Sequence, residues 1–371
     1  MNPRERLLTA LNCNIPDRVP ISTYELVGYN SQAWENNIPS YQKLMKAIRE
    51  KTDCVCMWGP RSNATFLESS SPISVDKTEW RENHTTVCKR TLHTPEGPLT
   101  QTKKIMDGLN TVWQTEHLCK SVQDVDRALS IPYRPLSYDT SDYARIQQEV
   151  GNNGIIMADL ADPLCLAAEL MELGEYTVWA MTETKHFDRT IEILNERNME
   201  NLKRMLEINV VDLYRIYGPE YATPPFLPPK LFKKAVLPYV SKMVDLIHSK
   251  GAKARIHCHG RISEVLETIL ETGADAIDPC EGPPDGDITL ADVKKRLYKK
   301  MCIFGNIQLK ILENGSSDEV KNTVTQCLDS AKDGGGYVIM PTAAPINSLL
   351  VHKTEENYLL FINTALEYGI Y

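Results

Sequence analysis

Short apolar segments alternate with longer amphipathic segments from about residue 154 onward. The short segments end in glycine, proline or polar residues, and they predict strands at 154–159, 210–218, 252–260, 274–281, 301–307 and 336–341. The longer segments have apolar residues three and four positions apart, and they predict helices at 229–251, 261–273 and 316–335. A repeated strand-then-helix order indicates a parallel sheet.

Two further strands are predicted upstream, at 18–23 and 53–59, with a helix near 40–51 between them. Eight strands with intervening helices predict an α/β fold, a TIM-like (β/α)8 barrel. The alternative is an open doubly wound sheet. Its dinucleotide-binding form is disfavoured because the chain has no G-x-G-x-x-G motif.

Between about 62 and 120 the pattern changes to alternating polar and apolar positions with turn signals. The sequence TPEG at 94–97 predicts a hairpin turn. We therefore expect one barrel domain over 1–371, with a β-rich insertion at 62–120 within a strand-to-helix loop.

Composition narrows the class of protein. The chain has 371 residues, of which 42% are hydrophobic, and a net charge of -8, which is typical of a soluble globular protein. With 49 acidic against 41 basic residues and no basic run, nucleic acid is not an expected partner. No apolar segment is long enough for a signal peptide or membrane span, so we expect a cytoplasmic protein without membrane association. The 10 cysteines are scattered, without C-x-x-C spacing, and most of them are expected to be reduced, small core residues.

Candidate catalytic side chains lie where the predicted strands end. In a barrel these ends converge on one mouth, where catalytic groups gather. Glu220 follows the predicted strand at 210–218, and His257 and His259 close the strand at 252–260. Cys280 lies at the end of the strand at 274–281, and Asn306 at the end of the strand at 301–307.

The two histidines suggest a metal site. Residues two apart on a strand share a face, so His257 and His259 can both point into the barrel while Cys258 points away; the opposite register would favour Cys258. With Glu220 and Cys280 from neighbouring strands, they would form a Zn²⁺ site with an open coordination position. Four candidates compete for three or four positions, and ordinary packing of buried histidine and cysteine is the alternative.

Other rim residues are candidates for binding a small organic substrate. Tyr24 and Glu25 close the first predicted strand, Trp58 closes the second, and Asp159 closes the strand at 154–159. Aromatic walls with a few polar groups are typical of such pockets. For Tyr24 and Trp58, simple packing is an equally good interpretation.

Several motifs together resemble the uroporphyrinogen decarboxylase superfamily. They are RERLLTALNCNIPDRVP (4–20), GPEYATPP (218–225), HCHG (257–260), DPCEGPPDGD (278–287), FGNI (304–307) and GGGYVIMPTAAPIN (334–347), and they span nearly the whole chain. The superfamily contains porphyrinogen decarboxylases and zinc-dependent methyltransferases that work with a corrinoid protein. The chain looks more similar to the second branch.

The resemblance also narrows the expected reaction. A porphyrinogen decarboxylase would carry an arginine-rich opening after the first strand, because arginine matches carboxylates, yet 23–36 contains none. Methyltransferases that pass methyl to a thiol carry His-x-Cys and a further cysteine near the last strand. Here those places read His257-Cys258-His259 and MPTAA (340–344).

The resemblance therefore implies a methyltransferase, the first component of an O-demethylase. It would move a methyl group from a small methoxylated aromatic compound to the Co(I) corrinoid of a partner protein. Zinc would act as a Lewis acid on the ether oxygen, or a proton donor beside that oxygen would assist its departure. His257, Glu220 and Asn306 are the catalytic candidates, and the insertion would form part of the rim that receives the partner.

Other functions stay open. The donor could be methanol or a methylamine, or the acceptor a thiol. The protein could be a uroporphyrinogen decarboxylase-like enzyme, which needs no metal, or a barrel that binds a ligand without catalysis. A homodimer is the candidate assembly.

Overall fold

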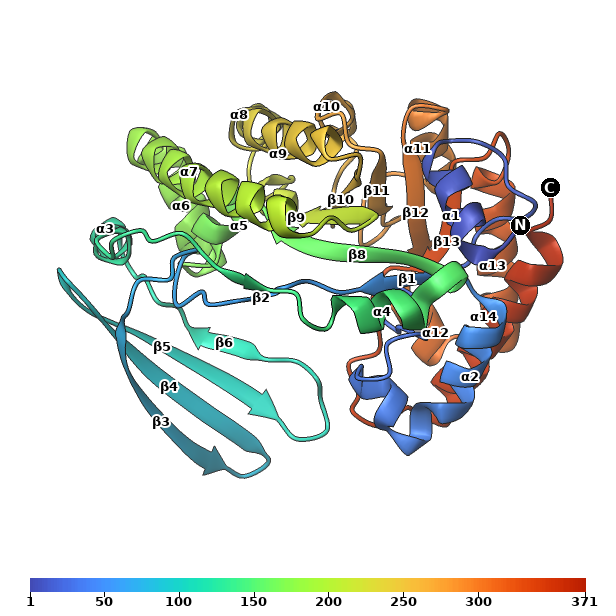
Figure 1. Ribbon diagram of the computed structural model, residues 1–371, viewed down its shortest axis with the longest axis horizontal. Helices are drawn as coiled ribbons and strands as arrows, with labels where there is room; N and C mark the ends of the chain where they lie inside the picture. The colour runs from blue at the N-terminus through green and yellow to red at the C-terminus, as the bar shows by residue number, and fades with distance from the viewer.

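Seven parallel strands form the centre of the protein in a computed structural model that describes residues 1–371 (Figure 1). Their order in the sheet is β1-β8-β9-β10-β11-β12-β13, so each strand pairs with the strand of this same sheet that follows it along the chain. The strands are β1 (Cys54–Met57), β8 (Gly154–Ala161), β9 (Leu213–Tyr217), β10 (Lys253–Cys258), β11 (Ala276–Pro279), β12 (Cys302–Ile307) and β13 (Tyr337–Pro341). The sheet curls as in a TIM barrel, which confirms the predicted fold class.

The strand predicted at 18–23 is reduced to a single bridge. Ile21 pairs in parallel with Ile339 of β13, and the Asp53 N–H donates to the Ile21 carbonyl at 2.8 Å. This segment therefore connects the two edge strands, β13 and β1. It does not form a longer ladder because Pro20 has no N–H and the Ile21 N–H donates to the Asp53 side chain instead of to a strand.

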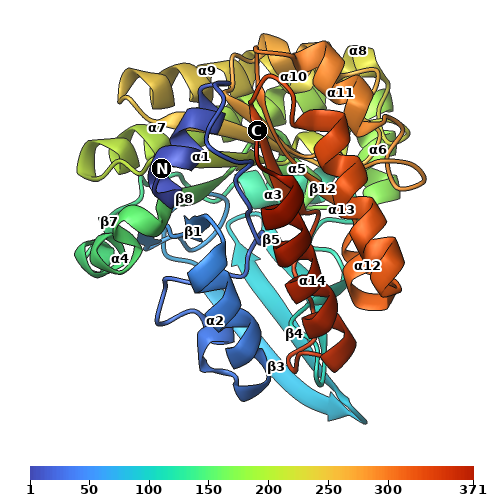
Figure 2. The same cartoon turned by 90° about the vertical axis from the view of Figure 1, so that its right-hand side faces the viewer.

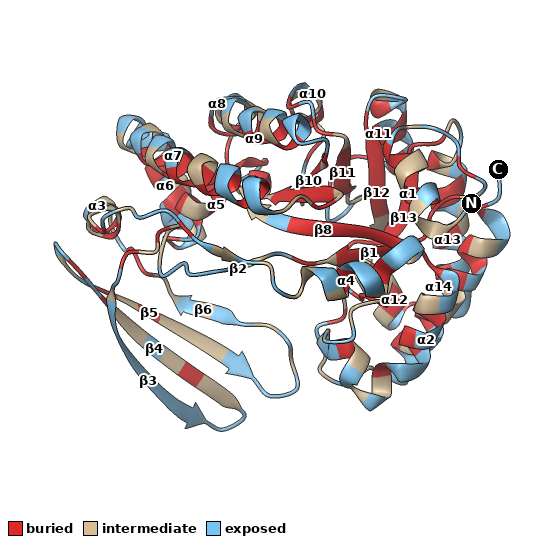
Figure 3. Ribbon diagram, in the orientation of Figure 1, coloured by how far each residue is buried: buried red, intermediate tan, exposed pale blue.

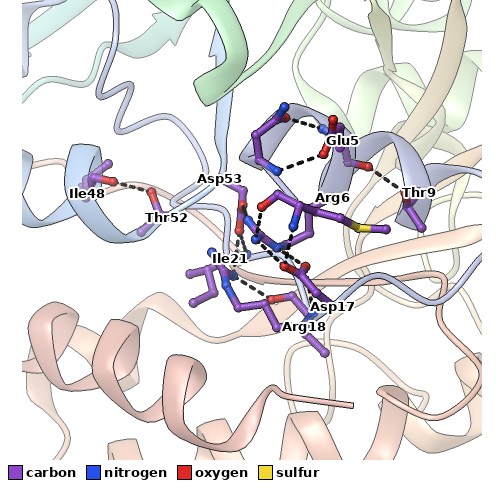
Figure 4. Close-up of polar contacts among 12 residues, drawn as sticks. Glu5, Arg6, Thr9, Asp17, Arg18, Ile21, Ile48, Thr52 and Asp53 are labelled. Atoms are coloured by element: carbon purple, nitrogen blue, oxygen red, sulfur yellow. Dashed lines mark hydrogen bonds and ion pairs between the residues drawn. The ribbon is translucent and has the colours of Figure 1, made fainter.

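Asp53 ties this connection to the first helix, as Figure 4 shows. Its carboxylate accepts hydrogen bonds from Arg6 Nη1 at 2.6 Å, Arg18 Nη1 at 2.8 Å and the Ile21 N–H at 2.8 Å. The Asp53 side chain is completely buried. A buried carboxylate needs such partners, because an unpaired charge in the interior is costly.

Helices cover the outer face of the strands. Figure 2 shows α2, α14, α13 and α11 at the end of the molecule that also carries both termini. The α-helices are α1 (Pro3–Leu11), α2 (Gln42–Lys51), α3 (Val122–Leu129), α4 (Tyr143–Val150), α5 (Pro163–Ala168), α6 (Leu173–Thr182), α7 (Thr184–Ile208), α8 (Pro229–Ala235), α9 (Leu237–Ser249), α10 (Leu266–Glu271), α11 (Leu290–Leu297), α12 (Leu309–Asn314), α13 (Ser317–Ala331) and α14 (His352–Tyr368). Four 3₁₀ turns are η1 (Trp34–Asn37), η2 (Pro39–Tyr41), η3 (Gly151–Asn153) and η4 (Pro219–Ala222). No helix combines the length and the apolar character needed to cross a bilayer.

The predicted helices are present with shorter bounds. The segment 229–251 divides into α8 and α9, because Pro238 near the start of α9 cannot donate a backbone hydrogen bond within a continuous helix. The predicted start at 316 is confirmed by a capping box between Ser316 and Glu319 at the N-terminus of α13.

Two apolar clusters lie on the two faces of the sheet. The larger one fills the space between the strands and the surrounding helices, and the smaller one fills the interior of the barrel. Leu7, Ala10 and Leu11 of α1 belong to the interior cluster, so α1 closes one end of the barrel. Most residues of β1 and of β8 to β13 are buried in Figure 3, because both faces of this sheet are covered.

The predicted insertion is a four-stranded antiparallel sheet, β3 (Ser74–Glu82), β4 (Thr85–Thr94), β5 (Gly97–Met106) and β6 (Trp113–Glu116). Thr94 pairs with Gly97, which confirms the hairpin turn predicted at TPEG. β3 is exposed along its length, and the sheet extends away from the barrel (Figures 1 and 3). A separate two-stranded pair joins β2 (Arg61–Ser62) to β7 (Tyr138–Asp139).

Candidate functional site

β10 presents its side chains alternately to the two sides of the sheet. Ala254, Ile256 and Cys258 belong to the apolar cluster that contacts the helices. Arg255 and His257 point to the opposite side, into the barrel, as the spacing of the strand requires. Of the two registers that the sequence left open, the structure has the one in which His257 points into the barrel, and Cys258 lies completely buried on the outer side.

The two histidines of the HCHG segment each contact a carboxylate through Nδ1. His257 Nδ1 lies 2.8 Å from Asp278 Oδ2, and His259 Nδ1 lies 3.2 Å from Glu281 Oε1. The other oxygen of Glu281 accepts the Gly260 N–H at 2.9 Å. The two imidazole rings meet edge to face, with centroids 4.6 Å apart. Carboxylates that hold Nδ1 fix both rings and leave each Nε2 for another partner, which is the usual support for a metal-binding histidine.

Asp278 also contacts the buried Arg255. The Arg255 Nε lies 2.8 Å from Asp278 Oδ1, as an ion pair without the alignment of a hydrogen bond. Burial opposes the ionisation of Asp278, but the charges of Arg255 and His257 hold the pKa of this carboxyl below its usual value. Asp278 is therefore an ionised acceptor that orients His257.

The environment of His259 differs because this residue lies beyond the end of β10. Burial acts to lower its pKa, but the hydrogen bond and charge of Glu281 raise it, with smaller contributions from Asp278 and Glu220. The side chain of His259 is 36% exposed, whereas that of His257 is 9% exposed. The pair of imidazoles thus extends from the barrel interior to solvent.

Glu220 lies on η4, which contacts β10. Its Oε2 accepts the Gly218 N–H at 2.9 Å. Gly218 has φ +122°, and a Cβ there would lie 2.1 Å from Asp162 Oδ1, so only glycine fits this turn before Glu220. The turn brings the Glu220 charge near His259.

The residues at the barrel mouth supply part of a binding site for a divalent metal ion. The two oriented imidazoles suit an ion that prefers nitrogen ligands. In this geometry no three histidine, cysteine, aspartate or glutamate side chains form a group that could hold a metal ion. Glu220 would have to approach His257 and His259 to complete a three-ligand set.

Cys280 and Asn306 do not join the imidazoles. Cys280 has φ +55°, and its fully buried side chain packs in the helix-side apolar cluster. The Asn306 amide donates to the Cys280 carbonyl at 2.7 Å, and its Oδ1 accepts from Cys327 Sγ on α13 at 3.5 Å. Both functional groups of Asn306 are therefore used to hold the end of β12 against its neighbours.

Three of the predicted rim residues surround Arg215 of β9. Asp159 makes two contacts with the guanidinium, at 2.7 Å and 2.5 Å, and Glu25 Oε1 lies 3.3 Å from Arg215 Nη2. The Arg215 guanidinium lies over the Tyr24 ring, 5.4 Å from its centroid, and the Tyr24 ring centroid is 6.3 Å from that of His257. Tyr24, Glu25 and Asp159 therefore meet beside the imidazole pair.

Trp58 takes a different direction. Its Nε1 donates to Asp142 Oδ1 at 3.1 Å, and its ring packs against Tyr143 of α4, with centroids 4.7 Å apart. The packing interpretation of Trp58 is the one that this geometry supports.

Four residues of this site were not among the candidates expected from the sequence: Arg215, Arg255, Asp278 and Glu281. Arg215 and Arg255 are paired neighbours on adjacent strands, and an Nη1 atom of each has no acceptor. The two arginines could have been identified from the sequence, because an arginine inside an otherwise apolar strand is rarely buried without a specific role.

Comparisons with known proteins agree with the fold and the motifs. Residues 112–368 match the family model described as uroporphyrinogen decarboxylase (URO-D). The methylcobamide:CoM methyltransferase MtaA of Methanosarcina barkeri is 22% identical over 215 residues, 57% of this chain and 61% of the relative. A uroporphyrinogen decarboxylase of Microcystis aeruginosa is 23% identical over 233 residues, 60% of this chain and 62% of the relative. The matches thus span about three fifths of the length of these curated relatives.

A methyltransferase from Methanosarcina mazei has a similar structure, with a TM-score of 0.62 and 16% identity over 99% of both chains. At this identity the similarity establishes the fold. The family model, in contrast, covers well over half of the chain and includes the HCHG and DPCEGPPDGD segments. The chain belongs to the uroporphyrinogen decarboxylase family.

Proposed function

We propose that the protein is a corrinoid-dependent methyltransferase that takes the methyl group of a small methoxylated aromatic compound. The observation that carries this proposal is the pair of imidazoles, His257 and His259, each oriented by a carboxylate at the barrel mouth. The name of the relative MtaA, a methylcobamide:CoM methyltransferase, supports transfer that involves a corrinoid. The acceptor in this proposal is the corrinoid of a separate protein.

His257, His259 and Glu220 would hold a zinc ion, and Cys280 remains a further candidate from the sequence. When bound, the zinc would supply Lewis acid assistance at the ether oxygen. Asp278 and Glu281 keep the imidazoles oriented through Nδ1.

The remaining residues of the mouth position the substrate. Breaking the methyl–oxygen bond leaves its electron pair on the aryl oxygen, while the methyl group passes to the reduced corrinoid. A tyrosine hydroxyl is protonated at neutral pH, and burial raises the pKa of Tyr24 further, so this hydroxyl can donate a hydrogen bond to an oxygen of the substrate. Glu25 and Asp159 hold the Arg215 guanidinium over the Tyr24 ring. We further propose that 1–371 acts as one barrel domain, with the 62–120 insertion at the rim that receives the corrinoid protein.

Removing the metal tests the function. The purified protein is expected to contain about one zinc per chain. It should demethylate a methoxylated aromatic only when reduced corrinoid protein is present. Chelation should abolish this activity, and added zinc should restore it. Full activity of a chelated, zinc-free protein would contradict the mechanism, and consumption of uroporphyrinogen without corrinoid would favour a decarboxylase.

Replacing Glu281 with alanine tests the support of His259. We expect zinc affinity to fall roughly 10- to 100-fold, because His259 loses the acceptor at Nδ1. Excess zinc should rescue the rate of methyl transfer, which a general loss of structure would not allow. Glu264→Ala, at an exposed position in the following loop, is the matched control. Unchanged zinc affinity in Glu281→Ala, measured by competition with a chromogenic chelator, would contradict this role.

A further inference from the structure

A cavity of about 580 Å³ lies between the inserted sheet and the barrel. One wall is formed by β4, β5 and β6 of the insertion. The other is formed by the 64–68 segment, the region from α5 to the start of α6, and Tyr221 of η4. Such a volume is large enough for a small organic ligand.

The sheet wall carries two positive charges side by side. Arg90 pairs with Gln101 across β4 and β5, and in the next row of the same face Lys103 pairs with Gln114. All four side chains line the cavity. Within the salt-bridge distance, neither Arg90 nor Lys103 contacts an acid, whereas Lys104 on the opposite face contacts Glu82 at 3.4 Å. The inward face therefore has two positive charges without a counter-ion.

Buried polar atoms of this wall lack partners. The Arg90 Nε is buried without an acceptor, and burial lowers the pKa of the guanidinium. Gln101 is only 4% exposed; its Nε2 donates to Gln114 at 2.6 Å, and its Oε1 has no partner. Buried polar groups without partners commonly mark a position occupied by water, an ion or a ligand.

The opposite wall has a different character. Its apolar side chains include Phe66, Leu166, Leu170 and Leu173. Two acids also line this wall. Glu68 accepts from Asn201 Nδ2 of α7 at 3.4 Å and Glu169 accepts from Cys165 Sγ of α5 at 3.7 Å, both uncharged donors, so the negative charges of this wall lie opposite the positive charges of the sheet. A ligand with one negative group and an apolar body would therefore bind with its charge toward the sheet and its body toward the barrel.

The cavity shares the η4 turn with the imidazole site. Tyr221 follows Glu220 on η4, so the residue that faces the cavity is next to the third metal-ligand candidate. A smaller cavity of about 160 Å³ shares Glu68 with the first and is lined by Asp159 and Tyr217 at the ends of β8 and β9. Glu68 thus lines both cavities, one beside the inserted sheet and the other at the ends of β8 and β9.

We propose that this cavity binds a methyl donor that carries a carboxylate, with Arg90 and Lys103 binding that group and the methoxy end directed toward the barrel. The inference rests on the proposed function and specifies its substrate class as methoxylated aromatic acids. Charge-assisted hydrogen bonds from a guanidinium and an ammonium suit a carboxylate. The inserted sheet would then select the donor.

Calorimetry with the full-length protein tests the proposal. The probes are 4-methoxybenzoate and its uncharged analogue 4-methoxybenzamide, which have nearly the same shape. Wild-type protein should bind the acid more tightly than the amide. The double substitution Arg90→Gln with Lys103→Gln should weaken binding of the acid roughly 10- to 100-fold and leave binding of the amide unchanged.

The matched control replaces Lys89 and Lys104, which lie on the opposite face of β4 and β5, with glutamine. It should leave binding of the acid unchanged. Equal binding of acid and amide by the wild-type protein, or equal losses in the two double variants, would overturn the proposal. These binding measurements require neither corrinoid protein nor methyl transfer. Selective binding of the acid without methyl transfer from any donor would support this site and refute the proposed function, whereas transfer from uncharged donors without selective binding would do the reverse.

Discussion

Replacing His257 with alanine is expected to lower the rate of methyl transfer by roughly three orders of magnitude or more. The assistance of a metal to a leaving oxygen is worth several kcal/mol, and each 1.4 kcal/mol is about a factor of ten in rate. His257 is the more buried of the two imidazoles, and Asp278 fixes it at 2.8 Å. We therefore expect it to be the ligand whose loss most reduces zinc binding.

Elemental analysis and a methyl-transfer assay with reduced corrinoid protein measure the two effects together. His352→Ala, at an exposed position on α14, should retain both zinc and activity. Because removal of a buried side chain can disturb folding, His259→Ala provides a second test at the more exposed ring. A folded His257→Ala protein with normal zinc content and normal rate would refute the assignment.

Cys280→Ala tests whether Cys280 is a zinc ligand, a question that the sequence left open. The thiol packs among apolar side chains on the helix side of the sheet, so its removal is expected to leave zinc content unchanged. A loss of zinc equal to that in His257→Ala would instead make Cys280 a ligand. In that case the metal-bound protein would differ from this structure around residue 280.

The largest expected effect on stability comes from Asp53→Asn. The carboxylate is completely buried and accepts from Arg6, Arg18 and the Ile21 N–H. Asparagine removes the negative charge of the carboxylate. Its amide NH2 group would also face the N–H donors of these partners, from which it cannot accept a hydrogen bond. Breaking such a buried network costs about 3–5 kcal/mol of the free energy of unfolding. Urea denaturation followed by circular dichroism measures this loss.

Asp17→Asn is the matched control for Asp53→Asn. Asp17 also contacts Arg6, at 2.7 Å, but its side chain is 43% exposed. Exposed ion pairs contribute little, so we expect a loss of about 1 kcal/mol or less. Equal destabilisation by the two substitutions would show that burial of Asp53 does not govern the stability of the connection between β13 and β1.

Local patterns in the sequence determined the main elements of the fold. Apolar runs ending in polar residues located six later strands, and the alternation of side chains along β10 correctly placed His257 and Cys258 on opposite faces. The TPEG turn and the capping box of α13 were predictable because each depends on interactions within a few residues.

Only the tertiary structure determined which partners the side chains at the ends of the strands contact. Asp278 and Glu281 reach the Nδ1 atoms of the histidines across neighbouring segments, while Asn306 holds a backbone carbonyl and Trp58 turns toward α4. The two-residue period of a strand fixes the face of a side chain, but beyond the strand its direction depends on contacts with distant segments. For the same reason the carboxylate of Asp53, far from Ile21 in the chain, replaced the ladder that the sequence predicted at 18–23.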